Sequence, residues 1–217
     1  MGKPTALDER LRAALADIAV PLLSDCLGRL NGIVGLRRFN RAAKLIGTAF
    51  TVKTRPGDNL YVYRALQEIA PGDVLVVDAG GGLDNAIVGD LLQFYARSRG
   101  CAGFVVDGAI RDVAAFEADD FPCFARGISH RGPFKSGPGH LRVPVSIGGQ
   151  VVSPGDVVVG DEDGVVSFAQ ADAERLVQAA QARKRDEEAI RAEIGSGARE
   201  QSWVAAFLEP KQPLSSA

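Results

Sequence analysis

Two short apolar runs constrain the fold of this chain more than any other feature: VLVVD at residues 74–78 and GFVVD at 103–107. Both are apolar up to the closing aspartate, which is typical of strands that are covered on both faces. Between them, residues 85–99 repeat apolar side chains, such as Ile87 and Leu91, at helical spacing. A strand, a helix and a strand in this order predict a parallel pair within an α/β sheet.

The remaining segments extend this unit on both sides. Helical periodicity predicts further helices at 6–18, 21–30, 59–69 and 171–194. Apolar and β-branched runs predict further strands at 44–53, 121–125, 143–147, 150–152, 157–159 and 164–168. The tail from residue 195 is less regular. We therefore expect one mixed α/β domain over residues 1–217, with parallel strands at its centre and antiparallel additions.

Composition excludes several classes of protein. Hydrophobic residues make up 46% and charged residues 24% of the 217 residues, as in globular domains. A net charge of −2 leaves no basic excess for nucleic-acid phosphates. No segment is apolar for long enough to form a signal-peptide core or a membrane span. The three cysteines are too few and too widely spaced for a disulfide framework. We expect a cytoplasmic protein with neither nucleic acid nor a membrane as its partner.

The tripeptide PGD occurs three times, at residues 56–58, 71–73 and 154–156. Proline followed by glycine suits the two central positions of a type II turn. The longer match between 71-PGDVLVVDAGG and 154-PGDVVVGDEDG leaves two interpretations open, a remnant of duplication or two turns built from the same residues.

A glycine-rich segment at 80–82 follows the first apolar run and precedes the helical segment that starts at residue 85. The unpaired N–H groups of a helix start can hold an anion, and a carboxylate suits a loop without lysine. The alternative is a plain turn, because no phosphate-binding motif is present.

The segment DGAIRD at 107–112 follows the second apolar run directly. Ligands of open α/β sheets bind beyond the carboxyl ends of the strands. Asp112 could ligate Mg²⁺, and Arg111 could pair with an organic carboxylate. The alternative is a helix-capping aspartate beside a surface ion pair.

Three further features have structural interpretations. The acidic segment at 160–164 suits a hairpin turn better than a calcium site. His130 and His140 lie in a loop rich in glycine and proline, without a catalytic or metal-binding spacing, although His130 could touch a substrate. Cys101 and Cys123 flank or occupy predicted strands, where cysteine acts as a small apolar residue.

These pieces, in this order, resemble the RraA-like family, which includes 4-hydroxy-4-methyl-2-oxoglutarate aldolases and the regulator of ribonuclease activity A. The resemblance covers about residues 17–194, through SDCLGRLNG, IGTAFTV, PGDN, PGDVLVVDAGG, DNAIVGDLL, GFVVDGAIRD and VPVSIGGQVVSPGDVVVGDEDGVV. It implies a layered α/β/β fold similar to a swivelling domain, with a mixed sheet, an N-terminal helix and a C-terminal helix and tail after residue 171. It also implies homotrimers or dimers of trimers, with sites at subunit interfaces.

The resemblance extends to a spacing of acidic and basic residues. The aldolases of this family carry an aspartate, twenty residues and then Arg-Asp, and Asp90 and Arg111-Asp112 match this pattern. The match implies that Asp112 ligates a divalent metal, Mg²⁺ or Mn²⁺, and that Asp90 holds water of its shell. Arg111 would face the pyruvyl part of a small 2-oxo acid substrate.

The same resemblance implies further contacts. The substrate carboxylate would lie at the helix start, against Gly89, Asp90 and the backbone N–H groups of Leu91 and Leu92. An acid from the C-terminal helix of the adjacent subunit would complete the site, with Glu187 as the candidate and Glu188 as the alternative. The loop 126–142 does not match residue by residue, so the substrate could differ from that of the named aldolases.

The implied activity is that of a metal-dependent class II aldolase, which cleaves 4-hydroxy-4-methyl-2-oxoglutarate to pyruvate through an enolate. Oxaloacetate decarboxylation passes through the same enolate. The competing expectation is a regulator that binds a ribonuclease without catalysis. A binding module has no evident need for Asp90, Arg111 and Asp112 together, which favours the enzyme.

Overall fold

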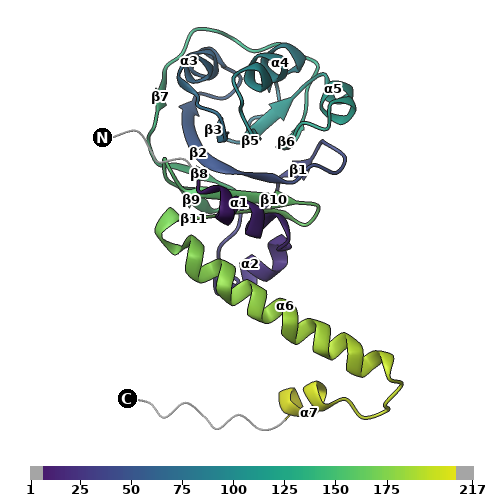
Figure 1. Ribbon diagram of the computed structural model, residues 1–217. Coiled ribbons are helices and arrows are strands. Elements are labelled where there is room, and N and C mark those ends of the chain that lie inside the picture. The colour runs from purple at the N-terminus through teal and green to yellow at the C-terminus, as the bar shows by residue number, and fades with distance from the viewer. Residues whose placement is uncertain (1–6, 209–217) are drawn as a thin grey trace, which may run out of the picture.

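The computed structural model describes residues 7–208 and shows a mixed sheet with helices on both sides (Figure 1). The helices are α1 Glu9–Ala16, α2 Val20–Cys26, α3 Leu60–Glu68, α4 Asp90–Ser98, α5 Val113–Ala118, α6 Ala173–Gly195 and α7 Ser202–Leu208, with a 3-10 turn, η1 Gln170–Asp172, before α6. The strands are β1 Arg37–Arg38, β2 Leu45–Thr54, β3 Asp73–Asp78, β4 Ala86–Val88, β5 Gly103–Ile110, β6 Cys123–Ile128, β7 Gly139–Leu141, β8 Val145–Ile147, β9 Gln150–Val152, β10 Val157–Asp161 and β11 Gly164–Phe168.

The nine-stranded sheet has the order β1-β6-β5-β3-β2-β10-β11, with β4 beside β5 and β7 beside β2. Strands β2, β3, β5 and β6 are parallel, whereas β1, β7, β10 and β11 pair antiparallel to their neighbours. The predicted parallel pair is confirmed, because β3 and β5 lie side by side in a register that sets Asp78 opposite Asp107. Both strands are buried almost throughout, as their apolar sequences predict.

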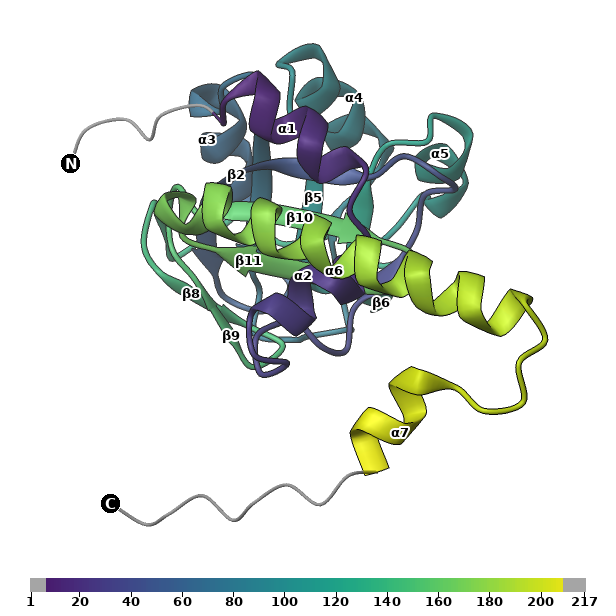
Figure 2. The ribbon, with the colours of Figure 1, turned by 60° about the horizontal axis from the view of Figure 1, so that its bottom comes forward.

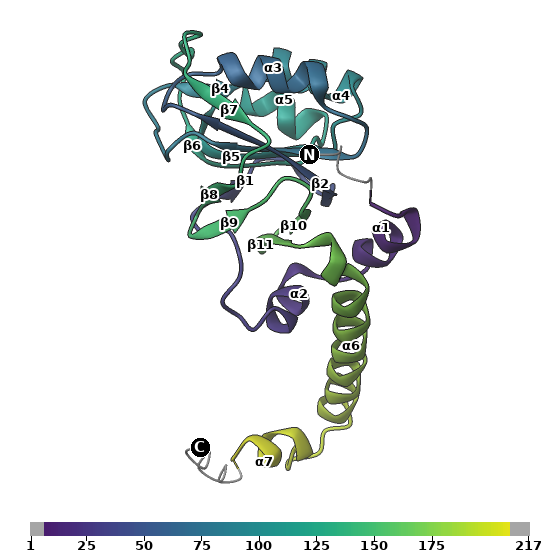
Figure 3. The same ribbon diagram turned by 90° about the vertical axis from the view of Figure 1, so that its left-hand side faces the viewer.

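The elements form layers (Figure 3). Helices α3, α4 and α5 cover one face of the parallel strands, and their apolar side chains share a core with that face. The opposite face packs against the β8–β9 hairpin and against inward-facing residues of β10 and β11. A third core lies between β10, β11 and the helices α1, α2 and α6, as Figure 2 shows. The expected layered α/β/β fold with helices at both ends is therefore present.

The three PGD turns have the predicted conformation. Their glycines Gly57, Gly72 and Gly155 have φ angles of 74°, 84° and 91°. A type II turn needs a positive φ at its third position, and glycine adopts it without a steric cost. Each turn sets the entry into the element that follows it.

The prediction of one helix over 85–99 was wrong at its start. Ala86–Val88 form the strand β4, which pairs with β5 through Ala86↔Ala109 and Val88↔Ile110, and the helix begins only at Asp90. The spacing of Ile87 and Leu91 fits a helix, but pairing with a distant strand takes precedence over this local pattern. The glycines at 80–82 therefore lead into a strand rather than into a helix.

Other differences concern short elements. Strands β1, β4 and β7 and the helix α5 were not predicted, and they span two to six residues each. The tail holds one more helix, α7, while residues 209–217 of that predicted tail lie outside the described residues. In the described part of the chain, no helix is both long and apolar enough to cross a membrane.

Candidate functional site

Three sequence-predicted residues meet where α4 begins and β5 ends. Asp90 is the first residue of α4, and Arg111 and Asp112 are the two residues between β5 and α5. The backbone N–H of Arg111 donates to the carbonyl of Val88 over 3.0 Å, which holds the end of β5 against the strand that leads to α4. The two segments are distant in sequence, and the sheet brings them together.

The carboxylate of Asp112 points toward α4. Its Oδ2 atom lies 3.2 Å from the backbone nitrogen of Asp90 and 3.3 Å from Nε of Arg111. Asp112 occupies the N-cap position of α5, yet its side chain makes no capping hydrogen bond there. The predicted surface ion pair is present, and the carboxylate accepts the first N–H of α4 instead of capping α5.

Asp112 also has a rare backbone conformation. Its φ of 55° and ψ of 40° place it in the left-handed region. Such a conformation in a residue other than glycine costs free energy and is often found where function requires a particular side-chain direction. Here it directs the carboxylate to the α4 start and away from the helix it precedes.

Gly89 leaves the space that Arg111 and Asp112 occupy. A Cβ atom at this position would lie 2.9 Å from Cγ and 3.1 Å from Nε of Arg111, and closer still to Oδ2 of Asp112. The φ of −150° at Gly89 is open to any residue, so glycine is needed here for space and not for backbone conformation. Gly89 is the N-cap of α4 and provides no side-chain cap.

A small pocket opens beside this cluster, and its space together with the solvent at its mouth amounts to about 340 Å³. It lies between the α4 start, β4, α3 and the loop after β6. Six residues that define it are Asn59, Tyr63, Gly89, Asp90, Arg111 and Lys135. Asn59, Tyr63 and Lys135 were not predicted from the sequence as site residues. Asn59 belongs to the matched PGDN segment, which is the one signal that pointed to it, and Lys135 lies in the loop that did not match.

Hydrogen bonds of Gln93 also stabilise the arrangement of the cluster. Gln93 is almost fully buried on α4, and its Nε2 donates to Oδ2 of Asp119 over 2.9 Å and more weakly to the carbonyl of Ala115. These bonds tie α4 to α5, the helix that Asp112 precedes. The position of Asp112 relative to Asp90 is thus held by the helices on both sides.

One of the two backbone N–H groups predicted to bind the substrate carboxylate already has a partner within the protein. The backbone N–H of Leu91 donates to Oδ1 of Asp90 over 2.7 Å. A substrate carboxylate at Leu91 would therefore replace the Asp90 side chain. The side chain of Leu91 is exposed, whereas that of Leu92 is buried in the core below α4.

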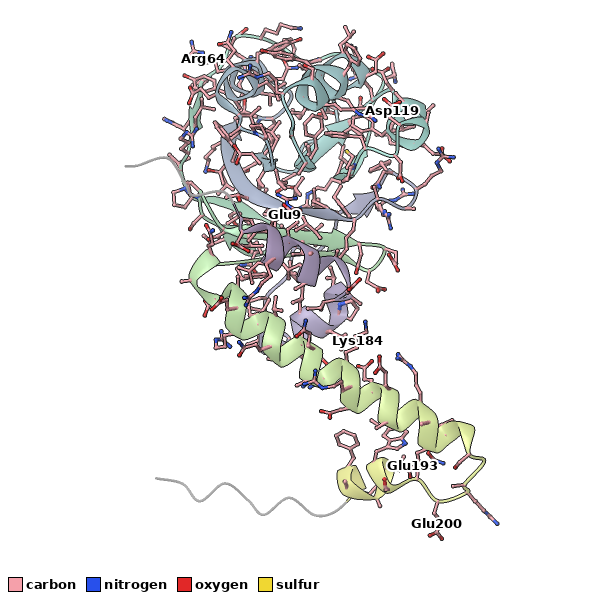
Figure 4. All side chains as sticks on the ribbon, viewed as in Figure 1. Glu9, Arg64, Asp119, Lys184, Glu193 and Glu200 are labelled. Atoms are coloured by element: carbon pink, nitrogen blue, oxygen red, sulfur yellow. The ribbon has the colours of Figure 1, made fainter. Side chains whose placement is uncertain are left out.

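The described chain does not bring Glu187 or Glu188 to this cluster. Both lie on the part of α6 that extends away from the sheet, on the side opposite to α4 and α5 (Figure 1). Figure 4 labels Lys184 and Glu193, which flank them on this extension. Glu187 pairs with Arg191 on its own helix over 3.4 Å. Its predicted role at the site of an adjacent subunit stays a prediction.

The glycine-rich turn at 80–82 favours the plain-turn interpretation. The backbone N–H of Gly80 donates to Oδ1 of Asp78, and that of Gly81 donates to the carbonyl of Asp107. Both donors therefore have partners within the protein and are not directed at a ligand.

The acidic segment at 160–164 joins β10 to β11 as a hairpin turn, as predicted. His130 and His140 are both exposed, and His140 lines a separate cleft beside Lys53. The thiols of Cys101 and Cys123 are buried, and burial raises the pKa of both, that of Cys101 to about 12. Neither is therefore an available nucleophile at neutral pH.

The donor set at the cluster fits a hard divalent cation. Within residues 7–208 no group of three or more His, Cys, Asp or Glu side chains forms a complete metal cage. Mg²⁺ does not need one, because it binds through one or two carboxylates and keeps several waters. The side chain of Asp112 is 39% exposed, and Asp90 is exposed, so both carboxylates are accessible from solvent.

Comparison with known proteins places this geometry in context. Residues 13–167 match the family model "RraA-like", described as Aldolase/RraA. A protein of Halalkalibacterium halodurans, named "Putative 4-hydroxy-4-methyl-2-oxoglutarate aldolase", is 42% identical over 173 residues, which cover 79% of this chain and 82% of that protein.

Two solved structures are similar in fold. One is an unusual member of the RNase ES inhibitor RraA protein family from Streptomyces coelicolor, with 30% identity and a TM-score of 0.79 over 86% of this chain and 98% of that one. The other is an uncharacterized protein from Pseudomonas syringae, with 28% identity and a TM-score of 0.81 over 91% of this chain and 94% of that one.

Proposed function

This chain belongs to the RraA-like family, and on that premise we propose that it is a divalent-metal-dependent aldolase. Its substrate would be 4-hydroxy-4-methyl-2-oxoglutarate or a similar 4-hydroxy-2-oxo acid, and its product pyruvate. One observation carries the proposal: Asp90 and Arg111 line a pocket, and Asp112 beside them adopts a strained conformation that directs its carboxylate to the start of α4.

The reaction requires a place for negative charge. When the C4 hydroxyl loses its proton, the C3–C4 bond breaks, its electron pair forms the enolate of pyruvate, and C4 becomes a carbonyl carbon. Protonation of the enolate at C3 then gives pyruvate. Arg111 lines the pocket with a guanidinium that can stabilise the enolate oxygen or the adjacent carboxylate.

Asp112 would hold the metal ion, with Asp90 oriented toward its water shell. When bound, Mg²⁺ or Mn²⁺ supplies a Lewis acid for the oxygens of the 2-oxo acid. Asp90 is exposed at the pocket and is the acid of this chain that can position a water to accept the hydroxyl proton. Cleavage of the C3–C4 bond of oxaloacetate releases C4 as CO₂ and leaves its electron pair in the same enolate, so we propose that decarboxylation occurs at the same site.

The site would be complete only in an oligomer. In the described chain the pocket is open beside α4, whose Leu91 and Phe94 side chains are 74% and 73% exposed. We propose a homotrimer or a dimer of trimers in which Glu187 of an adjacent subunit approaches Asp90. Glu187 would share the task of positioning the water that accepts the proton.

The second candidate is a ribonuclease regulator, because the Streptomyces relative is described as a member of an RNase inhibitor family. A regulator acts through its surface and does not require the Asp90–Arg111–Asp112 cluster. This candidate would be favoured if the Asp112→Ala variant inhibits a ribonuclease as strongly as the wild type does and neither protein forms pyruvate.

The test is pyruvate release, measured by coupling to lactate dehydrogenase. 4-Hydroxy-4-methyl-2-oxoglutarate and oxaloacetate are supplied separately, with Mg²⁺ and with EDTA. We expect metal-dependent release that Asp112→Ala abolishes. Asp163→Ala, the same change in the exposed β10–β11 turn, is the matched control and should keep wild-type activity. No release from either substrate by the folded wild type would refute the aldolase proposal.

A further inference from the structure

We propose that Asp58 and Asn59, which follow Pro56 and Gly57 of the first PGD turn, are positioning residues that hold two opposite sides of the site pocket. One side is the loop 133–138, and the other is the β4–α4 junction at Gly89. This inference deepens the proposed function and rests on it for its effect on substrate binding, but the positioning itself is measurable without any substrate.

The evidence for Asp58 is a set of three backbone donors around a fully buried carboxylate. Its Oδ2 accepts the N–H groups of Ser136 over 2.7 Å and of Gly137 over 2.9 Å. Its Oδ1 accepts the N–H of Leu60 over 2.9 Å. The guanidinium of Arg55 lies 3.4 Å from Oδ2 of Asp58. Burial alone would raise the pKa of Asp58, but these partners hold that pKa below its usual value.

Backbone hydrogen bonds hold the same loop at Phe134, two residues before Ser136. The N–H of Asn59 donates to the carbonyl of Phe134 over 3.0 Å, and the N–H of Phe134 donates to the carbonyl of Gly57 over 2.8 Å. Lys135 thus lies between Phe134 and Ser136, both of which are anchored to the PGD turn. The pocket side that carries Lys135 depends on these bonds.

Asn59 holds the other side. It is the N-cap residue of α3, but its side chain makes no capping hydrogen bond. Instead its Nδ2 donates to the carbonyl of Ile87 over 3.0 Å, two residues before Gly89. The residue is 2% exposed, and its side chain therefore connects α3 to β4 inside the protein.

The Oδ1 atom of Asn59 takes no part in these contacts. It is buried and has no hydrogen-bond partner among residues 7–208. A buried acceptor without a partner is costly, so such an atom is expected to meet a donor of a ligand or of a bound water. Asn59 lines the pocket, so that donor would come from the pocket contents.

The other PGD turns provide an internal comparison. The carboxylate of Asp73 accepts the N–H of Ala70, and that of Asp156 accepts the N–H of Ser153, three residues earlier in each case. The carboxylate of Asp58 reaches Ser136, 78 residues away in sequence. Asp58 of the first turn thus holds a loop that is distant in sequence and that borders the pocket.

The experiment compares Asp58→Asn with Asp156→Asn. Asparagine keeps the size of the side chain but has a single, uncharged acceptor oxygen, so it cannot hold the N–H groups of Leu60, Ser136 and Gly137 together as the carboxylate does. Amide hydrogen exchange reports the loop directly. We expect the amides of Ser136 and Gly137 to exchange at least about tenfold faster in Asp58→Asn and unchanged in Asp156→Asn.

Kinetics then separates positioning from chemistry. We expect Asp58→Asn to raise the KM for pyruvate formation about tenfold while kcat changes less than about threefold, because the chemical groups remain in place. If Asp58→Asn does not fold, Asn59→Ala provides the same test. It should accelerate exchange in residues 84–90 and raise KM in the same way.

The outcomes are distinguishable. A wild type that releases no pyruvate refutes the proposed function, and the exchange rates still decide whether Asp58 holds the loop. An active wild type with equal exchange rates and equal KM values for Asp58→Asn and Asp156→Asn overturns this inference. Faster exchange with an unchanged KM also overturns it, because the loop would then have no part in binding.

Discussion

The backbone N–H of Asp90 donates to the carboxylate of Asp112 over 3.2 Å. This bond joins the first residue of α4 to the residue that precedes α5. The connection from β4 to α4 and the connection from β5 to α5 are therefore joined by one hydrogen bond at the edge of the pocket. Arg111 contacts the same carboxylate, so the effects of substitutions at these three residues on stability and activity should not be additive.

Gly89→Ala should inactivate the protein without unfolding it. The new Cβ atom would lie 2.9 Å from Cγ of Arg111 and would also press on Asp112, so both side chains must move. A displacement of about 1 Å at a reacting group costs roughly a hundredfold in rate. We expect that loss in kcat/KM for pyruvate release, with a melting temperature within about 5 °C of the wild type, because φ at Gly89 suits alanine.

The control for this change is Gly195→Ala at the end of α6. No atom lies within 4 Å of a Cβ atom placed there. The control should keep full activity. Wild-type activity of Gly89→Ala would show that the arrangement of Arg111 and Asp112 over Gly89 does not matter to the reaction.

Asp112→Gly and Asp112→Ala should be equally inactive but differ in stability. Both remove the carboxylate, whereas only alanine keeps a Cβ atom in the left-handed conformation of this position. That conformation costs an alanine about 1 kcal/mol relative to glycine. Urea unfolding should therefore show Asp112→Gly to be the more stable variant by about that amount. Equal stability would mean that the backbone at 112 relaxes when the carboxylate is lost.

Much of the fold could be predicted from local patterns. The runs 74–78 and 103–107 were identified as buried strands because their apolar residues leave no solvent-facing side. The start of the helix at 85–99 was wrong because Ala86–Val88 pair with β5, and pairing between distant segments leaves no mark in a helical periodicity. The strand β7 lies in a segment rich in glycine and proline and forms through backbone bonds to β2.

The site could be predicted only in part, for a related reason. Asp90, Arg111 and Asp112 follow strands or begin a helix at one edge of the sheet, so their proximity follows from the topology. Lys135 reaches the same pocket through the path of the loop 133–138, which depends on the buried carboxylate of Asp58. Asn59 reaches it at the start of α3, where its side chain bonds to β4. No local pattern reports a contact between residues 58 and 136.

Asp120→Asn should destabilise the protein at neutral pH and progressively less in acid. The carboxylate of Asp120 accepts the backbone N–H groups of Arg41, Ala42 and Ala43. Hydrogen bonds from Ala42, the Asn40 side chain and Ala43 are the main reasons that its pKa is lowered to about 2. Its stabilisation is therefore complete above the unfolded pKa of about 3.9 and is lost as the pH falls toward 2.

Urea unfolding of the wild type and of Asp120→Asn at several pH values measures this effect. The difference between their midpoints should be constant from pH 7 to about 5 and should shrink below about pH 4. Asp163→Asn in the β10–β11 turn serves as the comparison. A difference that does not change with pH would show that the carboxylate form of Asp120 is not what holds residues 41–43.

The proposed role of Glu187 can be tested by mixing subunits. Asp112→Ala and Glu187→Gln should each be inactive alone, because each lacks one part of every site. If a site takes Asp112 from one subunit and Glu187 from its neighbour, unfolding and refolding the two variants together in equal amounts restores about a quarter of the sites, since half of the subunits and half of their neighbours carry the needed residue. Pyruvate release by the mixture measures that fraction, and Glu188→Gln in place of Glu187→Gln distinguishes the two acids. A mixture as inactive as its components would place Glu187 outside the neighbouring site and leave Asp90 as the acid that positions the water.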